Sequence, residues 1–180
     1  MSRGPFRTAI LSPLLAVVLL ACSSAGPYGY SRTYVPLSEE EDVAEGAVEF
    51  DPVMADRRSD DWAKKKVSIF GVVESLGEGA GGSGNVLLSV RGLQDRNLCL
   101  SHEDDTCRVT VTDKEFYRIH ASLELDPKDD VRPGSLLRVI GKLSQKTDPK
   151  TGNNVVDAAY YRHWPAVEFV TLSQREFYRQ

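Results

Sequence analysis

Runs of alternating apolar and polar residues, each bounded by turn-forming residues, most constrain what this chain can fold into. The runs cover residues 67–76, 86–91, 107–112, 136–143 and 155–161. Successive side chains of a β-strand point to opposite faces, so alternation with a period of two predicts strands. The first run is apolar on both faces and predicts a central strand. Short strands separated by turn signals predict a mainly β domain.

One helix is predicted between the third and fourth strands. Thr112 and Glu115 have the spacing of a capping box, in which each side chain satisfies a backbone amide at the start of a helix. The stripe that would pack inward consists of Phe116, Ile119, His120 and Leu123. We expect His120 to be a hydrogen-bonded residue at the rim of this stripe, because no nucleophile is spaced to meet it.

The first residues have the form of a secretory signal. Arg3 and Arg7 precede an apolar segment over residues 9–20. A membrane-spanning helix needs about 20 apolar residues, and this segment is too short. The positive flank and the small residue at its end are typical of a leader that is cleaved. Residues 1–21 are therefore excluded from the predicted fold.

The end of this leader, Leu19-Leu20-Ala21-Cys22, resembles the lipobox of bacterial lipoproteins. The resemblance implies cleavage before Cys22, a diacylglycerol on its sulfur and an acyl chain such as palmitate on its new amino group. Ser23 after the cysteine, where aspartate would favour the inner membrane, implies the outer membrane. The implied location is the cell envelope, with the domain facing the periplasm or the cell surface. The alternative is an ordinary cleaved signal that leaves Cys22 as a thiol.

The sequence after the leader divides into three parts. Residues 22–63 show no sustained period and include the acidic run 39–42, so they predict a lipidated, flexible acidic tether. Residues 64–172 hold the predicted strands and form the barrel domain. Residues 173–180 predict a short C-terminal helix or tail. The length of the chain after the leader is typical of one domain.

Two cysteines remain once Cys22 is assigned to lipid. Cys99 and Cys107 are an even pair in an oxidising compartment, which predicts a disulfide bond. Closing this short loop would stabilise the fold by about 2.5 kcal/mol in the chain-entropy model. The alternative is a mixed-ligand metal site, whose candidate ligands are Cys99, His102, Asp104, Asp105 and Cys107.

The charge of the chain argues against nucleic acid as a partner. The 180 residues include 22 basic and 26 acidic side chains, and two of the basic ones lie in the leader, so the remaining chain carries a net charge of −6. Nucleic-acid binding depends on Lys and Arg contacts to phosphate. We therefore expect no nucleic acid among the partners.

The order of the predicted elements over residues 67–165 resembles the OB-fold. That fold is a five-stranded Greek-key barrel with one helix between strands three and four. The aromatic run over residues 160–165, together with the lipobox, is similar to the Slp-type outer-membrane lipoproteins. This second resemblance implies an envelope protein without known catalysis.

Fold analogy also suggests where a ligand would bind. OB-folds use the face of strands two and three and the loops that join strands one to two and four to five. In this sequence the analogy selects Arg91, Arg108 and Thr110, with loops at residues 77–85 and 148–153. These positions rest on the fold alone.

The predicted function is that of a membrane-anchored, non-enzymatic envelope lipoprotein. Its barrel would bind an envelope protein or glycan or support the outer membrane, with no catalytic residue, metal or cofactor. One alternative is a metal-dependent or hydrolytic enzyme that uses Cys99, His102, Cys107 and His163. A second alternative is an oligonucleotide-binding OB-fold, which the net charge and the lack of an aromatic run on strands two and three disfavour.

Overall fold

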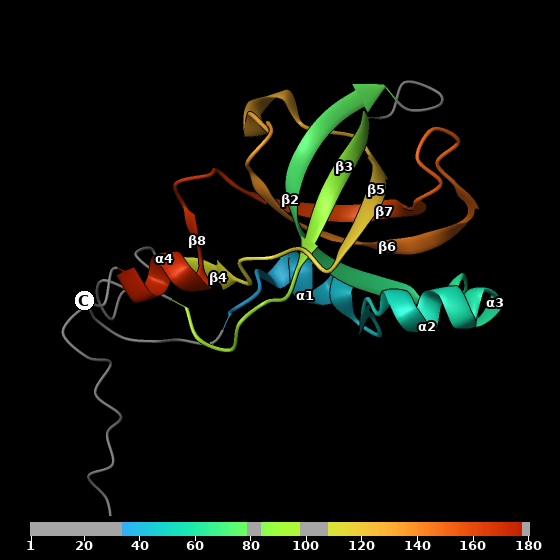
Figure 1. The fold of residues 1–180 in the computed structure, drawn as a ribbon, viewed down its shortest axis with the longest axis horizontal. Coiled ribbons are helices and arrows are strands. Elements are labelled where there is room, and N and C mark those ends of the chain that lie inside the picture. Colours follow the sequence, from blue (N-terminus) through green and yellow to red (C-terminus); the bar gives the residue numbers. More distant parts are fainter. Residues whose placement is uncertain (1–33, 79–83, 98–107, 178–180) are drawn as a thin grey trace, which may run out of the picture.

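A β-barrel forms most of the described part of the chain, which comprises residues 34–78, 84–97 and 108–177 of the computed structural model (Figure 1). The barrel strands are β2 (Lys66–Glu78), β3 (Gly84–Arg91), β5 (Tyr117–Leu123), β6 (Leu136–Thr147) and β7 (Asn154–Trp164).

The barrel closes because β2 pairs on both of its edges. It is antiparallel to β3 on one side and to β6 on the other. β3 then pairs antiparallel with β5, β5 pairs parallel with β7, and β7 pairs antiparallel with β6. This is the strand order of the OB-fold, so the predicted five-stranded Greek-key barrel is confirmed.

The apolar residues of the alternating runs fill the barrel interior. Every second side chain of a strand points inward, and these positions are aliphatic. The fully or nearly fully buried interior side chains include Val67, Ile69, Val73, Val86, Leu88, Val90, Ile119, Ala121, Leu123, Leu137, Val139 and Val156. The intervening positions face outward and are available for a ligand or for covering elements.

The helix predicted after Thr112 is wrong, because this segment contains the barrel strand β5. Tertiary contacts use both residues of the supposed capping box. The Thr112 hydroxyl accepts a hydrogen bond from the Gly92 amide at 3.0 Å, and the Glu115 carboxylate accepts one from the Ser89 hydroxyl at 2.8 Å. The connection from β5 to β6 holds one short 3-10 turn, Pro127–Asp129, where the OB-fold helix was expected.

The strand predicted over residues 107–112 lies outside the barrel. Its described part, β4 (Val109–Val111), pairs parallel with β8 (Phe169–Thr171), and α4 (Leu172–Phe177) follows β8. Figure 1 shows these three elements beside the barrel. The short strand predicted over residues 167–172 is confirmed by β8. A second apolar cluster joins this small sheet to the barrel and consists of Phe70, Val109, Val111, Leu136, Trp164 and Phe169.

Residues 34–63 are folded against the barrel, so the predicted flexible tether is wrong for this part. The segment forms α1 (Ser38–Ala44), β1 (Val48–Glu49), α2 (Pro52–Arg57) and α3 (Ser59–Trp62). β1 pairs parallel with β2, and Phe50 and Trp62 pack edge to face with ring centroids 6.2 Å apart. These elements are too short for a periodic pattern to reveal them. No helix among the described residues is long and apolar enough to cross a membrane.

Candidate functional site

The outer face of β3 and β5 is the surface where an OB-fold usually meets its ligand. Three side chains from each strand point outward there because their neighbours fill the interior. They are Asn85, Leu87 and Ser89 from β3, and Arg118, His120 and Ser122 from β5. We call this surface the β3–β5 face.

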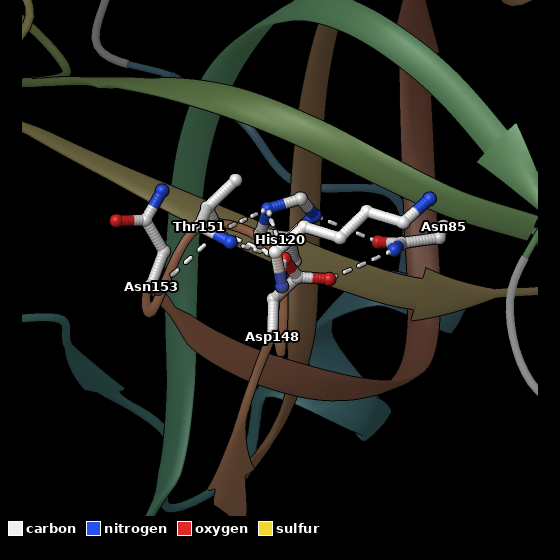
Figure 2. A network of polar contacts seen from close by, with 6 residues as sticks. Asn85, His120, Asp148, Thr151 and Asn153 are labelled. Atoms are coloured by element: carbon white, nitrogen blue, oxygen red, sulfur yellow. Dashed lines mark hydrogen bonds and ion pairs between the residues drawn. The ribbon is translucent and has the colours of Figure 1, made fainter.

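A buried polar network fixes the loop between β6 and β7 at one end of the β3–β5 face (Figure 2). His120 Nδ1 lies 2.8 Å from Asn85 Oδ1, and His120 Nε2 lies 3.0 Å from Thr151 Oγ1 and 3.7 Å from Asp148 Oδ1. The His120 and Asp148 residues are each only 7% exposed. The sequence indicated a hydrogen-bonded His120, but placed it on a helix.

Asp148 holds the loop in its turn. Its Oδ1 accepts hydrogen bonds from the amides of Lys150 at 3.0 Å and Thr151 at 2.8 Å, and from the Thr151 hydroxyl at 2.9 Å. Gly152 adopts a φ of 72°, which glycine accepts without strain. The turn predicted from Asp148 to Asn153 is therefore confirmed. The loop has a defined shape before any ligand binds.

This network predicts how stability depends on pH. The hydrogen bond from the Thr151 amide is the main cause that holds the pKa of Asp148 below its ordinary value. A lowered pKa in the folded state adds stability above the ordinary value of about 3.9, and this stability is lost as the pH falls through the folded pKa. We therefore expect the free energy of unfolding, measured in urea at stepwise lower pH, to fall less steeply for Asp148→Asn than for the unmodified chain. Equal slopes would contradict this role of Asp148.

Arg118 is the exposed cation of the β3–β5 face. Its side chain is 54% exposed and lies between two carboxylates, 3.2 Å from Glu74 and 3.1 Å from Glu115. Exposed ion pairs of this kind contribute little to stability, so an incoming anion can replace either carboxylate. The hydrogen bonds to Glu115 are the main cause that raises the pKa of Arg118.

Of the three ligand residues selected by fold analogy, Arg108 and Thr110 do not lie on the β3–β5 face, whereas Arg91 points outward from β3, two residues beyond Ser89. Arg91 lies at the end of β3, where its guanidinium donates to the Asp113 carbonyl. Thr110 is fully buried, and its amide donates to Asn97 at 3.2 Å. Arg108 precedes β4, which is outside the barrel. Arg108 and Thr110 were misplaced because β5, rather than residues 107–112, is the third barrel strand.

A second group of side chains with binding chemistry lies on the outer surface of β2, β6 and β7. Strand pairing aligns Phe70 with Arg138, and Arg138 with Arg162, across these strands. Trp164 lies two residues further along β7. We call Phe70, Arg138, Arg162 and Trp164 the arginine–aromatic cage. Sequence analysis did not predict it, because its members come from three strands that are far apart in the chain.

The cage encloses two side chains of the N-terminal segment. The Tyr34 ring packs edge to face on Phe70 and Trp164, with centroids 5.5 Å and 6.0 Å away. The Glu40 carboxylate accepts from Arg138 at 2.6 Å and from Arg162 at 3.1 Å, and also from the Tyr34 hydroxyl. Glu40 is therefore fully buried, although it belongs to an acidic run predicted to be solvated.

These contacts shift the pKa values of both enclosed groups. Burial raises the pKa of Glu40, but the hydrogen bonds from Tyr34 and Arg138 outweigh burial, and the pKa lies below its ordinary value. Burial and the hydrogen bond to Glu40 raise the pKa of Tyr34. Glu40 is thus a buried carboxylate anion and Tyr34 a neutral phenol.

Several candidate residues lie outside the described residues. They are the lipidation site Cys22, the disulfide candidates Cys99 and Cys107, and the remaining metal candidates His102, Asp104 and Asp105. His163, from the enzyme alternative, is described: its Nε2 lies 3.0 Å from the Ser135 hydroxyl, and burial lowers its pKa. Over residues 34–78, 84–97 and 108–177, no three His, Cys, Asp or Glu side chains are arranged to hold a metal ion.

Among known proteins, the chain is similar to solved structures. No protein-family model matches the sequence, and no curated protein sequence matches it significantly. The barrel is similar to the small single-stranded DNA-binding protein from Streptomyces coelicolor, with 20% identity, a TM-score of 0.34, and coverage of 57% of this chain and 94% of that chain. It is also similar to PriB from Ralstonia solanacearum, with 19% identity, a TM-score of 0.31, and coverage of 55% and 97%.

Two predictions about function are corrected by these neighbours. The main prediction was a membrane-anchored envelope lipoprotein whose barrel binds an envelope protein or glycan, and it is contradicted. The predicted absence of a nucleic-acid partner is contradicted as well, since a neighbour is described as a single-stranded DNA-binding protein.

Proposed function

We propose that the barrel binds single-stranded nucleic acid on the β3–β5 face. The observation that carries the proposal is the loop of residues 148–153, which the His120 network fixes beside this face. A loop that is already ordered loses little conformational entropy when a ligand binds, so binding is less costly. The proposed activity is binding alone, and no catalytic step is assigned.

Two cations can contact phosphate groups in this arrangement. Arg118 points outward near the start of β5, and a guanidinium can bind phosphate oxygens in a bidentate manner. Lys150 is exposed in the fixed loop. A phosphate on Arg118 would replace Glu74 or Glu115 as its ionic partner.

An apolar side chain near Arg118 can contact the bases. Leu87 lies on β3 directly opposite His120, two residues along the strand from the partner of Arg118. The hydrophobic contact it provides is independent of sequence. We therefore expect binding with little base preference, as in other single-strand binders that recognise bases without reading their edges.

The acidic groove next to β5 limits the extent of the site. It occupies about 560 Å³ where β5 and β7 separate, and its lining includes Glu124 and Asp157. These carboxylates repel phosphate, so we expect the nucleic acid to follow β3 and the near edge of β5 and to avoid this groove.

The proposal predicts weak, salt-dependent binding. For a fluorescently labelled single-stranded oligonucleotide, we expect a dissociation constant of about 1–100 µM, the range of non-specific binding. With two phosphate contacts on single-stranded nucleic acid, the logarithm of the association constant should fall with the logarithm of the salt concentration with a slope of about −1.4. Arg118→Ala should weaken binding about fivefold and reduce the slope to about −0.7, because one of two phosphate contacts is lost. Fluorescence anisotropy measures both quantities.

A matched control removes a cation from another face. Lys142 is exposed on β6, away from the β3–β5 face, so Lys142→Ala should leave affinity and slope unchanged. Lys150→Ala should behave like Arg118→Ala. Equal effects of all three substitutions would show attraction by overall charge and would contradict the proposed site. No anisotropy change at low salt would contradict the proposed function.

We also propose that Cys22 carries lipid and that Cys99 and Cys107 form a disulfide bond, as the lipobox and the cysteine count predict. Intact-mass spectrometry of the chain purified from membranes without reductant should show added acyl mass that Cys22→Ala removes. It should also show two hydrogens fewer than the reduced form. An unlipidated mass would contradict the first proposal, and free thiols would contradict the second.

A further inference from the structure

The arginine–aromatic cage has the composition of a ligand site, although the chain itself occupies it. Arg138 and Arg162 have their Cζ atoms 5.3 Å and 5.6 Å from the Tyr34 ring centroid, and Phe70 and Trp164 pack on the same ring. The two guanidiniums also bind the Glu40 carboxylate. The cage thus holds one aromatic ring and one anion next to each other.

The segment that occupies the cage is held mainly by polar contacts. Glu40 is the one buried residue of the seven in α1. The other end of the helix is fixed by Lys66, whose Nζ donates to the carbonyls of Val43 at 2.8 Å and Glu45 at 3.1 Å. Val35 and Leu37 are 65% and 50% exposed, so the Tyr34 ring, which packs on Phe70 and Trp164, is the main apolar contact of this segment with the cage. A competing anion can therefore displace it more readily than it could displace a helix packed by apolar side chains.

We propose that the cage is a nucleotide-binding site from which the ligand displaces Tyr34 and Glu40. The phosphate would take the place of the Glu40 carboxylate between Arg138 and Arg162, since guanidinium groups bind phosphate as they bind carboxylate. The base would take the place of the Tyr34 ring against Phe70 and Trp164, where aromatic and cationic contacts hold a flat ring. This inference does not rest on the proposed function, because the cage lies on β2, β6 and β7.

The exchange of α1 amide hydrogens in the full chain tests the proposal, with adenosine monophosphate as the probe. Displacement of Glu40 should open α1, so millimolar adenosine monophosphate should speed exchange over residues 38–44. The same concentration of inorganic phosphate should have a smaller effect, because it lacks the ring. An equal effect of phosphate would show that the cage recognises only an anion and would overturn the proposal.

Three variants connect the effect to the cage. Arg162→Lys keeps the positive charge but loses the planar guanidinium and its contact with the Trp164 ring. It should therefore abolish the response to adenosine monophosphate. Arg132→Lys is the matched control, because Arg132 is 69% exposed and pairs with Asp130 away from the cage. Its response should equal that of the unmodified chain.

Tyr34→Phe keeps the ring and removes the hydroxyl that donates to Glu40. It should lower the adenosine monophosphate concentration needed for half-maximal exchange by about tenfold, the effect of one hydrogen bond to a charged group. Unchanged exchange in both the unmodified chain and Tyr34→Phe would overturn the proposal, even if the oligonucleotide binds to the β3–β5 face.

Discussion

Gly141→Ala is expected to destabilise the barrel by about 3 kcal/mol or more, at the upper end of what overpacking costs. Gly141 lies on β6 where the register with β7 shifts, so that Ile140 pairs with Tyr160 and Gly141 with Ala158. A Cβ atom at Gly141 would lie 2.2 Å from the Asp157 carbonyl oxygen and 2.8 Å from the Ala158 Cα. Both contacts are with backbone, so the two strands would have to separate. Urea unfolding monitored by circular dichroism measures the loss.

Gly77→Ala is the matched control for this prediction. Gly77 is also a strand glycine, but the nearest atom to its added Cβ would be the Asn85 carbonyl oxygen at 3.6 Å, an ordinary contact. We expect its effect to stay within about 0.5 kcal/mol. Similar losses for both variants would contradict the close contact between β6 and β7 at Gly141.

Ile119→Ala should lower the free energy of unfolding by about 2–5 kcal/mol, because it leaves a cavity in the barrel interior. Ile119 is fully buried on β5 and belongs to the main core cluster. Phe116→Ala should cost about 1 kcal/mol or less, since Phe116 is 46% exposed and precedes the strand. Urea unfolding of the two variants measures the difference.

This pair also distinguishes a strand from a helix at this position. In a helix, Phe116 and Ile119 would share the buried stripe and both substitutions would be costly. In β5 the side chains that fill the barrel interior are Ile119, Ala121 and Leu123. A loss at Phe116 as large as the loss at Ile119 would therefore contradict β5 as a barrel strand.

The segment after Thr112 shows why the sequence supported the fold but misplaced one strand. Ile119 and Leu123 are four residues apart, so they lie on one face of a helix and also on one face of a strand. Thr112 and Glu115 match a helix cap locally, but Gly92 and Ser89 are their hydrogen-bond partners. Ser89 lies on β3 and Gly92 directly follows that strand, and a local pattern contains no information about either residue.

Contacts between residues far apart in the chain also explain why the candidate sites were predicted only in part from the sequence. Asp148 and the turn after it were predictable, because a turn forms within a few residues. The contact of that turn with His120 and Asn85 depends on barrel closure. Glu40 was predicted to be solvated because it lies in an acidic run, yet Arg138 and Arg162 bury it.

The net charge of the chain does not describe the proposed binding face. A charge of −6 describes the chain after its leader as a whole, whereas a ligand meets the charges of one face. Arg118 on the β3–β5 face and Lys150 in the loop beside it are exposed cations, and the acidic groove next to β5 lies to one side. Local potential, rather than net charge, governs where an anion binds.

Mapping of backbone amide chemical shifts during titration with a single-stranded oligonucleotide tests the central claim most directly. We predict that the largest shifts fall on Leu87, Arg118, His120 and Lys150, on the β3–β5 face and its fixed loop. We expect small shifts at Glu124 and Asp157, which line the acidic groove. Shifts confined to Arg138 and Arg162, or no shifts at low salt, would contradict the claim that this face binds single-stranded nucleic acid.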